Sequence, residues 1–74
     1  IAAMADPVIV NARGMKCPWP ALRAARAMRD APAIRIEADD PIAGRELEAL
    51  ARQNGWLFAV LDTHQYALSR MAPD

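Results

Sequence analysis

Apolar residues recur with two different periods along this 74-residue chain. A period of two is typical of strands, and apolar residues three and four apart are typical of helices. Together they predict six elements in the order β-α-β-α-β-β, at residues 8–10, about 18–29, 34–38, 41–54, 56–61 and 66–71. This order is typical of an α/β domain.

The two helices are predicted from their apolar sides and their end signals. On the first helix, four residues share one side and are expected to face the core: Ala21, Leu22, Ala25 and Met28. On the second, the core stripe is expected to be Ala43, Leu47, Leu50 and Ala51. Asp40-Pro41 predicts an N-cap followed by proline at the first helical position, and Asn54-Gly55 predicts the C-terminal stop.

The strands predict a mixed four-stranded sheet in a two-layer sandwich. Residues 34–38 alternate, so that strand is expected to show one face to the core and one to water. The last two strands are joined by residues 62–65, a length suited to an antiparallel hairpin. Both helices are expected on one face, which leaves the other face of the sheet open.

Composition limits the kinds of protein this can be. The formal net charge is zero, which argues against binding nucleic acid mainly through its phosphates. The longest apolar run, residues 56–61, is far shorter than the roughly 20 residues that cross a bilayer. One cysteine, Cys17, and one histidine, His64, exclude an internal disulfide and are too few for a zinc site. We therefore expect a reducing cytoplasm, no cofactor and a monomer.

The domain is expected to span residues 7–72. Residues 1–6 are expected to be disordered or left over from cloning, with Met4 as a candidate natural initiator. We find no secretory signal in the first twenty residues.

The sole thiol lies where a loop meets the first predicted helix, in the segment Arg13-Gly14-Met15-Lys16-Cys17-Pro18-Trp19-Pro20. The positive end of the helix and the charges of Arg13 and Lys16 favour a thiolate, so we predict a lowered pKa. Gly14 permits a loop conformation that brings Cys17 to the surface. With no second cysteine and no neighbouring histidine or asparagine, Cys17 is expected to pass its chemistry to another molecule.

Several neighbours of Cys17 are candidates for holding it or for docking a partner. Pro18 and Pro20 stiffen the turn, and either Cys17 or Trp19 is the helix N-cap. Trp19 is either an exposed anchor for a partner or folded over the helix end. Arg23 and Arg26 either steer an acidic partner or simply form a solvated helix face. Asp39 and Asp40 are expected to act as caps only.

Arg13-Gly14, followed by Cys17-Pro-x-Pro at a helix start and by Asp39-Asp40-Pro41 at the next, resembles the TusA (SirA-like) family of sulfur carriers. The resemblance spans nearly the whole domain and implies a two-layer sandwich with a mixed four-stranded sheet. It implies that Cys17 accepts sulfane sulfur as a persulfide from a donor protein, such as a cysteine desulfurase or a rhodanese, and passes it to an acceptor protein. The implied pathways are tRNA thiolation, molybdenum cofactor supply, and oxidation or uptake of sulfur compounds. Asn11 and Trp19 depart from the family pattern, where acidic residues are frequent.

Two other functions remain open from the sequence. The chain can be an RNA- or protein-binding module that uses Trp56, Phe58 and Tyr66 on the open sheet face, with the thiol incidental. It can also be a redox sensor whose exposed thiolate is oxidised or capped by glutathione.

Overall fold

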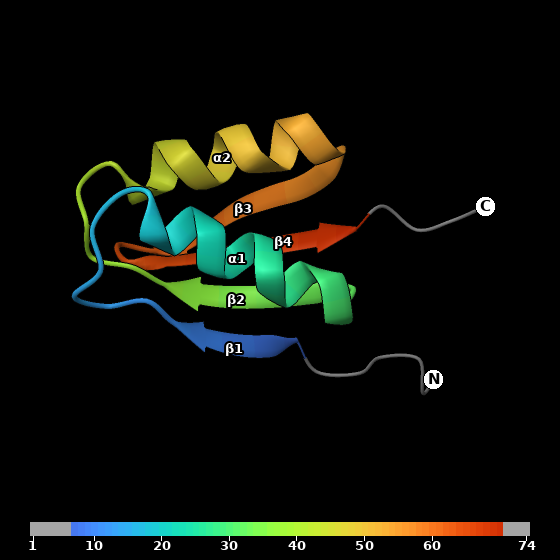
Figure 1. Cartoon of the computed structure of the whole chain (residues 1–74), viewed down its shortest axis with the longest axis horizontal. Coiled ribbons are helices and arrows are strands. Elements are labelled where there is room, and N and C mark those ends of the chain that lie inside the picture. Colours follow the sequence, from blue (N-terminus) through green and yellow to red (C-terminus); the bar gives the residue numbers. More distant parts are fainter. Residues whose placement is uncertain (1–6, 71–74) are drawn as a thin grey trace.

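Six elements make up the part of the chain that the computed structural model describes, residues 7–70 (Figure 1). They are β1 (Val8–Asn11), α1 (Trp19–Asp30), β2 (Ala33–Glu37), α2 (Ala43–Asn54), β3 (Trp56–Asp62) and β4 (Gln65–Arg70). The predicted β-α-β-α-β-β order and the α/β class are confirmed. The predicted N-terminal segment 1–6, and residues 71 and 72 of the predicted last strand and domain, lie outside the described residues.

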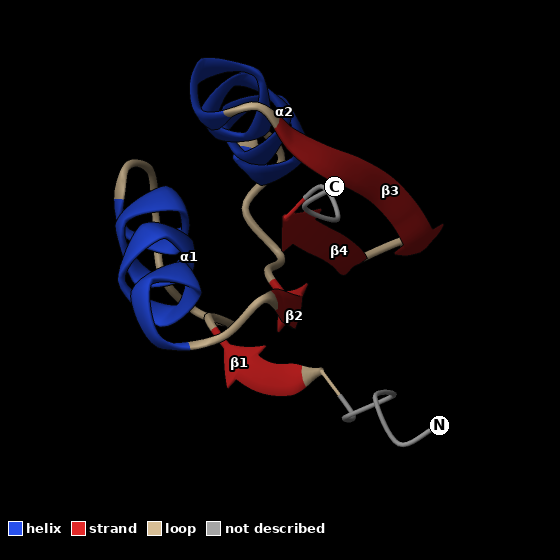
Figure 2. Ribbon diagram, turned by 90° about the vertical axis from the view of Figure 1, so that its right-hand side faces the viewer, coloured by secondary structure: helices blue, strands red, loops and turns tan. Residues whose placement is uncertain are grey.

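The strands form one mixed sheet in the order β1-β2-β4-β3. β1 and β2 are parallel, with Val8 beside Ile34 and Val10 beside Ile36, and α1 is the crossover between them. β4 runs antiparallel to both of its neighbours, and a two-residue turn joins it to β3. Figure 2 shows α1 and α2 on the same side of this sheet, as predicted. No helix within residues 7–70 is long and apolar enough to cross a membrane.

The core lies between the helices and the sheet. Its largest fully buried side chains are Met28, Ile34, Ile36, Leu47, Leu68 and Pro20. The predicted alternation in β2 is confirmed, since Ile34 and Ile36 are buried while Arg35 between them is exposed. The predicted stripe of α2 and its stop are also confirmed, with Gly55 in the left-handed conformation at φ 71°. Glycine adopts this conformation without the clash that a Cβ atom would bring.

The predicted core side of α1 is correct at Met28 and wrong at Leu22. The residues that this helix buries are Pro20, Ala24 and Met28, whereas Leu22 is 51% exposed. Alanines occur on several sides of α1, so the apolar period does not select one side. Ala24, with no exposed surface, lets the helix backbone lie close to the sheet. Leu22 is thereby left on the surface.

The predicted start of α2 is also wrong by two residues. The helix begins at Ala43 with Ile42 at the N-cap position, and Pro41 lies in the preceding turn. Asp40 stabilises that turn instead of capping the helix, because its Oδ1 atom accepts a 2.9 Å hydrogen bond from the amide of Ile42.

The aromatic residues do not lie on the open face of the sheet. Phe58 is paired with the buried Leu68, and Tyr66 is itself buried, so both point to the helix side. Their rings stack with centroids 6.0 Å apart, and Trp56 and Phe58 pack against the core. The alternative of a base-stacking platform on the open face is therefore contradicted, because these side chains pack on the helix side of the sheet.

Candidate functional site

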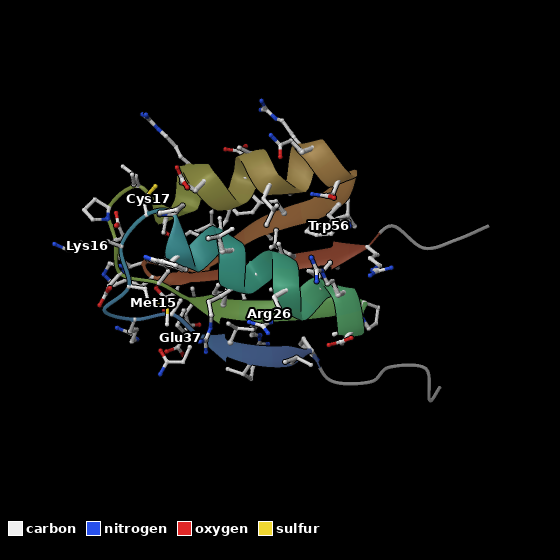
Figure 3. The ribbon with its side chains drawn as sticks, in the orientation of Figure 1. Met15, Lys16, Cys17, Arg26, Glu37 and Trp56 are labelled. Atoms are coloured by element: carbon white, nitrogen blue, oxygen red, sulfur yellow. The ribbon has the colours of Figure 1, made fainter. Side chains whose placement is uncertain are left out.

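Cys17 lies in the loop between β1 and α1, partly exposed, at the end of the sheet that the first turn of α2 also reaches (Figure 3). The loop starts from a fully buried residue, Ala12, whose amide donates a 2.8 Å hydrogen bond to the carbonyl of Glu37. It ends where the amide of Trp19 donates to the carbonyl of Lys16 at 2.8 Å. Backbone hydrogen bonds thus fix both ends of the loop, and Cys17 lies between them at the surface.

Two consecutive aspartates hold the cysteine loop. The amide of Gly14 donates to Oδ1 of Asp39 at 2.9 Å, and the amide of Cys17 donates to Oδ2 of Asp40 at 2.9 Å. The prediction that these residues act only as helix caps is therefore wrong. The Asp40 carboxylate joins the Cys17 loop to the turn before α2, because its other oxygen bonds the amide of Ile42.

The ionisation of Asp40 reflects this double role. Its pKa is lowered, first by the hydrogen bond from the amide of Ile42, then by the one from Cys17, and also by the positive charge of Lys16, with some opposition from desolvation. Each of these contacts favours the charged carboxylate. At neutral pH the loop is therefore held by an anion.

Arg13 and Gly14 shape the loop, but Arg13 does not approach the sulfur. The Nε atom of Arg13 forms a 3.0 Å ion pair with Oε1 of Glu37, and its amide donates to Oδ1 of Asn11 at 3.0 Å. In Figure 3, Glu37 and Cys17 lie on different sides of the loop. Gly14 has a φ of +81°, which side chains rarely adopt, so the predicted need for glycine here is confirmed.

The predicted lowering of the thiol pKa is contradicted by the surroundings of Cys17. Its pKa is raised, first by a hydrogen bond to the Glu46 side chain, then by desolvation, and then by the negative charges of Glu46 and Asp40. Lys16, on which the prediction relied, is exposed and points outward (Figure 3). The acidic neighbours and the loss of solvation therefore set the direction of the pKa shift of Cys17.

The prolines and Trp19 set the start of α1. The residue at the N-cap position is Pro18, so neither Cys17 nor Trp19 occupies it as predicted. Pro20 is buried and fixes the first turn to the core, while Pro18 is exposed beside the thiol. Trp19 is 59% exposed, which agrees with the interpretation of a presented side chain and not with one folded over the helix end.

An open depression of about 290 Å³ lies along α1 beside the cysteine loop. It is lined by Met15, Trp19, Leu22, Arg23 and Arg26, and we call this set the α1 groove. The structure thus brings together three predicted docking residues, Trp19, Arg23 and Arg26. Met15 and Leu22 were not predicted. The available signal was the spacing of three and four residues from Trp19 to Leu22 and Arg23, and again from these two to Arg26.

Glu46 is a further residue near Cys17 that the sequence did not reveal. It is half buried in the first turn of α2. The signal for Glu46 in the sequence was weak: a glutamate in the first turn of the helix that follows Asp40-Pro41. Within residues 7–70, no three histidine, cysteine, aspartate or glutamate side chains form a group that could hold a metal ion.

A comparison with protein families agrees with this geometry. The family model described as Sulfurtransferase TusA matches residues 8–68, which include the whole cysteine loop, both helices and the α1 groove. A search of curated protein sequences gives no significant match.

Proposed function

Because the chain belongs to the TusA family of sulfurtransferases, which transfer sulfur from protein to protein, we propose that it carries sulfane sulfur as a persulfide on Cys17. The observation that carries this proposal is the position of Cys17, the single cysteine of the chain. Its side chain is partly exposed on a loop, and its backbone amide donates a hydrogen bond to Asp40. An exposed, fixed thiol can meet a persulfide on another protein without any movement of the core.

The transfer balances without a cofactor. The Cys17 thiolate attacks the outer sulfur of a donor persulfide, the donor's sulfur–sulfur bond breaks, and the donor leaves as a thiolate that takes up the proton lost by Cys17. The new bond is the sulfur–sulfur bond of the Cys17 persulfide. An acceptor thiolate then repeats the attack on the outer sulfur, and Cys17 leaves as a thiolate that takes up the proton lost by the acceptor. No external oxidant or reductant is consumed in either step.

The α1 groove supports the view that partners dock beside the thiol. Trp19 and Leu22 expose apolar surface there, and Arg23 and Arg26 add positive charge. Large aromatic and arginine side chains contribute most to binding at protein interfaces. We therefore propose that donor and acceptor proteins place an apolar anchor flanked by acidic residues in this groove. We further propose that the carrier works in a reducing cytoplasm and serves a pathway such as tRNA thiolation.

The two alternative functions are less well supported. The aromatic residues of a nucleic-acid-binding module lie on the helix-covered face. A redox sensor would react through the same Cys17 thiolate as a carrier, and the family match over residues 8–68 favours the carrier.

The test is sulfur loading followed by intact mass. Reduced protein is incubated with a cysteine desulfurase and cysteine, or with a rhodanese and thiosulfate. The proposal expects the gain of one sulfur atom, its removal by dithiothreitol, and no gain in Cys17→Ser. Protein that acquires no sulfur from any donor would contradict the proposal.

A further inference from the structure

The two aspartates that bond to the cysteine loop lie on a main chain that is itself fixed. Ala38, the fully buried residue before them, donates its amide to the carbonyl of His64 in the β3–β4 turn at 3.0 Å. The carbonyl of Asp40 accepts the amide of Ala43, the first residue of α2, at 3.0 Å. Asp39 and Asp40 are therefore held between the end of β2 and the start of α2, beside the loop that joins β1 to α1 (Figure 1).

From this position the two carboxylates reach the cysteine loop at two points. Oδ1 of Asp39 accepts the amide of Gly14, and Oδ2 of Asp40 accepts the amide of Cys17, each at 2.9 Å. The second of these amides belongs to the residue that carries the thiol. With its main chain fixed, the sulfur of Cys17 is left with rotation about the Cα–Cβ bond alone.

The proposed docking surface for the donor is built by a different part of the chain. The α1 groove lies along α1, whereas the two carboxylates come from the segment between β2 and α2. In a docked complex the sulfur of Cys17 must lie in line with the sulfur–sulfur bond of the donor, and a misplacement of about 1 Å can slow such a step about a hundredfold. A small reagent that diffuses freely approaches the sulfur in whatever direction it points, so its reaction does not depend on this alignment.

We propose that Asp39 and Asp40 are positioning residues for sulfur transfer: through the amides of Gly14 and Cys17 they align the sulfur with a persulfide that a partner presents from the α1 groove. This inference rests on the proposed persulfide chemistry of Cys17. Neither carboxylate gives up a proton or an electron pair in the transfer, and the bonds that form and break are those described above. The two aspartates therefore favour docked donors over small ones.

The two carboxylates are used differently, which allows one type of substitution to test both. Within residues 7–70, Asp39 accepts one hydrogen bond through its side chain, whereas Asp40 accepts two, from Ile42 at Oδ1 and from Cys17 at Oδ2. Asparagine keeps one carbonyl oxygen and carries an NH₂ donor in place of the other. It can therefore replace Asp39, but in place of Asp40 it turns a donor toward one of the two amides. Both substitutions remove the same negative charge.

The first test measures single-turnover loading of Cys17 as a function of the concentration of a protein donor that the wild type accepts. We expect Asp39→Ala, Asp40→Ala and Asp40→Asn each to lower the rate at saturating donor by about tenfold. The half-saturating concentration should stay the same, because the α1 groove is intact. Asp39→Asn should restore most of the rate that Asp39→Ala loses. Asp62→Asn is the matched control, because Asp62 accepts the amide of Thr63 at 2.8 Å outside the cysteine loop, and it should load like the wild type.

The second test separates alignment from reactivity and from folding. Alkylation of Cys17 by iodoacetamide at pH 7 should be no slower in Asp40→Asn than in the wild type, because this change also removes a negative charge that raises the pKa of the thiol. Circular dichroism checks that each variant is folded. Alkylation and loading that slow together would overturn the inference, since loss of alignment affects the docked donor alone.

The inference and the proposed function fail in different ways. Equal saturating rates in the wild type and Asp40→Asn, or a change in the half-saturating concentration alone, would overturn the inference while Cys17 still carries sulfur. A wild-type protein that does not load from any donor would overturn the proposed function, and this inference with it.

Discussion

Asp40 holds Cys17 by its main chain, through a 2.9 Å hydrogen bond from the cysteine amide to Oδ2 of the carboxylate. The same carboxylate raises the pKa of the thiol by its negative charge, a smaller effect than that of Glu46. Asp40 therefore fixes the position of the sulfur and at the same time opposes its ionisation.

The hold exerted by Asp40 should depend on pH. Since the folded-state pKa of Asp40 is lowered, its stabilisation is present above the unfolded value of about 3.9 and is lost as the pH falls through the lower folded value. We expect Asp40→Ala to have a lower urea midpoint than the wild type at pH 7, and the two midpoints to converge below about pH 4. Asp30→Ala, at the exposed end of α1, is the control. A difference that persists unchanged at pH 2.5 would exclude this role of Asp40.

The α1 groove should matter for protein donors and not for small reagents. We expect Leu22→Ala and Arg26→Glu each to slow sulfur loading from a protein donor by about tenfold, the effect of a 1.4 kcal/mol loss at an interface. Alkylation of Cys17 should be unchanged, because neither side chain contributes to its raised pKa. Arg52→Glu, exposed on α2, serves as the charge control. Equal loading rates in all three variants would show that partners dock elsewhere.

Two glycines provide a matched pair of backbone tests. Gly14 and Gly55 both have positive φ angles, and an added Cβ atom would meet nothing within 4 Å at either position. Each change to alanine should therefore cost about 1 to 2 kcal/mol of unfolding free energy through backbone strain alone. Only Gly14→Ala should also slow the loading of Cys17, because Gly14 lies in the cysteine loop and its amide donates a hydrogen bond to Asp39. Denaturant unfolding and intact mass give the two readings, and slow loading in Gly55→Ala would be the contrary result.

The orientation of α1 can be checked by two truncations. Met28 is fully buried and Leu22 is 51% exposed. We expect Met28→Ala to lower the unfolding free energy by about 2 to 5 kcal/mol, the usual cost for a core residue of this size. Leu22→Ala should cost less than about 1 kcal/mol. The reverse order in urea unfolding would mean that α1 is rotated about its axis.

The elements with the strongest periodicity are those that the sequence predicts best. In α2, Leu47 and Ala51 follow a single stripe that ends at Gly55, and in β2 the polar Arg35 separates two isoleucines. In α1 the alanines leave the inward side undetermined, because packing of the helix against the sheet and not the local pattern decides it.

The surface position of Cys17 was predictable from the sequence, and the contacts around it were not. Cys17 is marked by its uniqueness and by the adjacent prolines. Its contacts with Asp40 and Glu46 cross from one loop and helix to another, 23 and 29 positions along the chain, so no local pattern records them. The direction of the Cys17 pKa shift follows from those contacts. The charges nearest in sequence, on Arg13 and Lys16, predicted the opposite direction.

The strand directions place the cysteine loop at one end of the sheet, and the first residue of β1 and the last residue of β4 at the other. β1 runs toward the cysteine loop, and β4, antiparallel to its neighbour β2, runs away from it. Val8 and Arg70 therefore lie at the end of the sheet remote from Cys17 (Figure 1). A fused protein, an affinity tag or a bead attached beside Val8 or Arg70 would therefore lie away from the thiol.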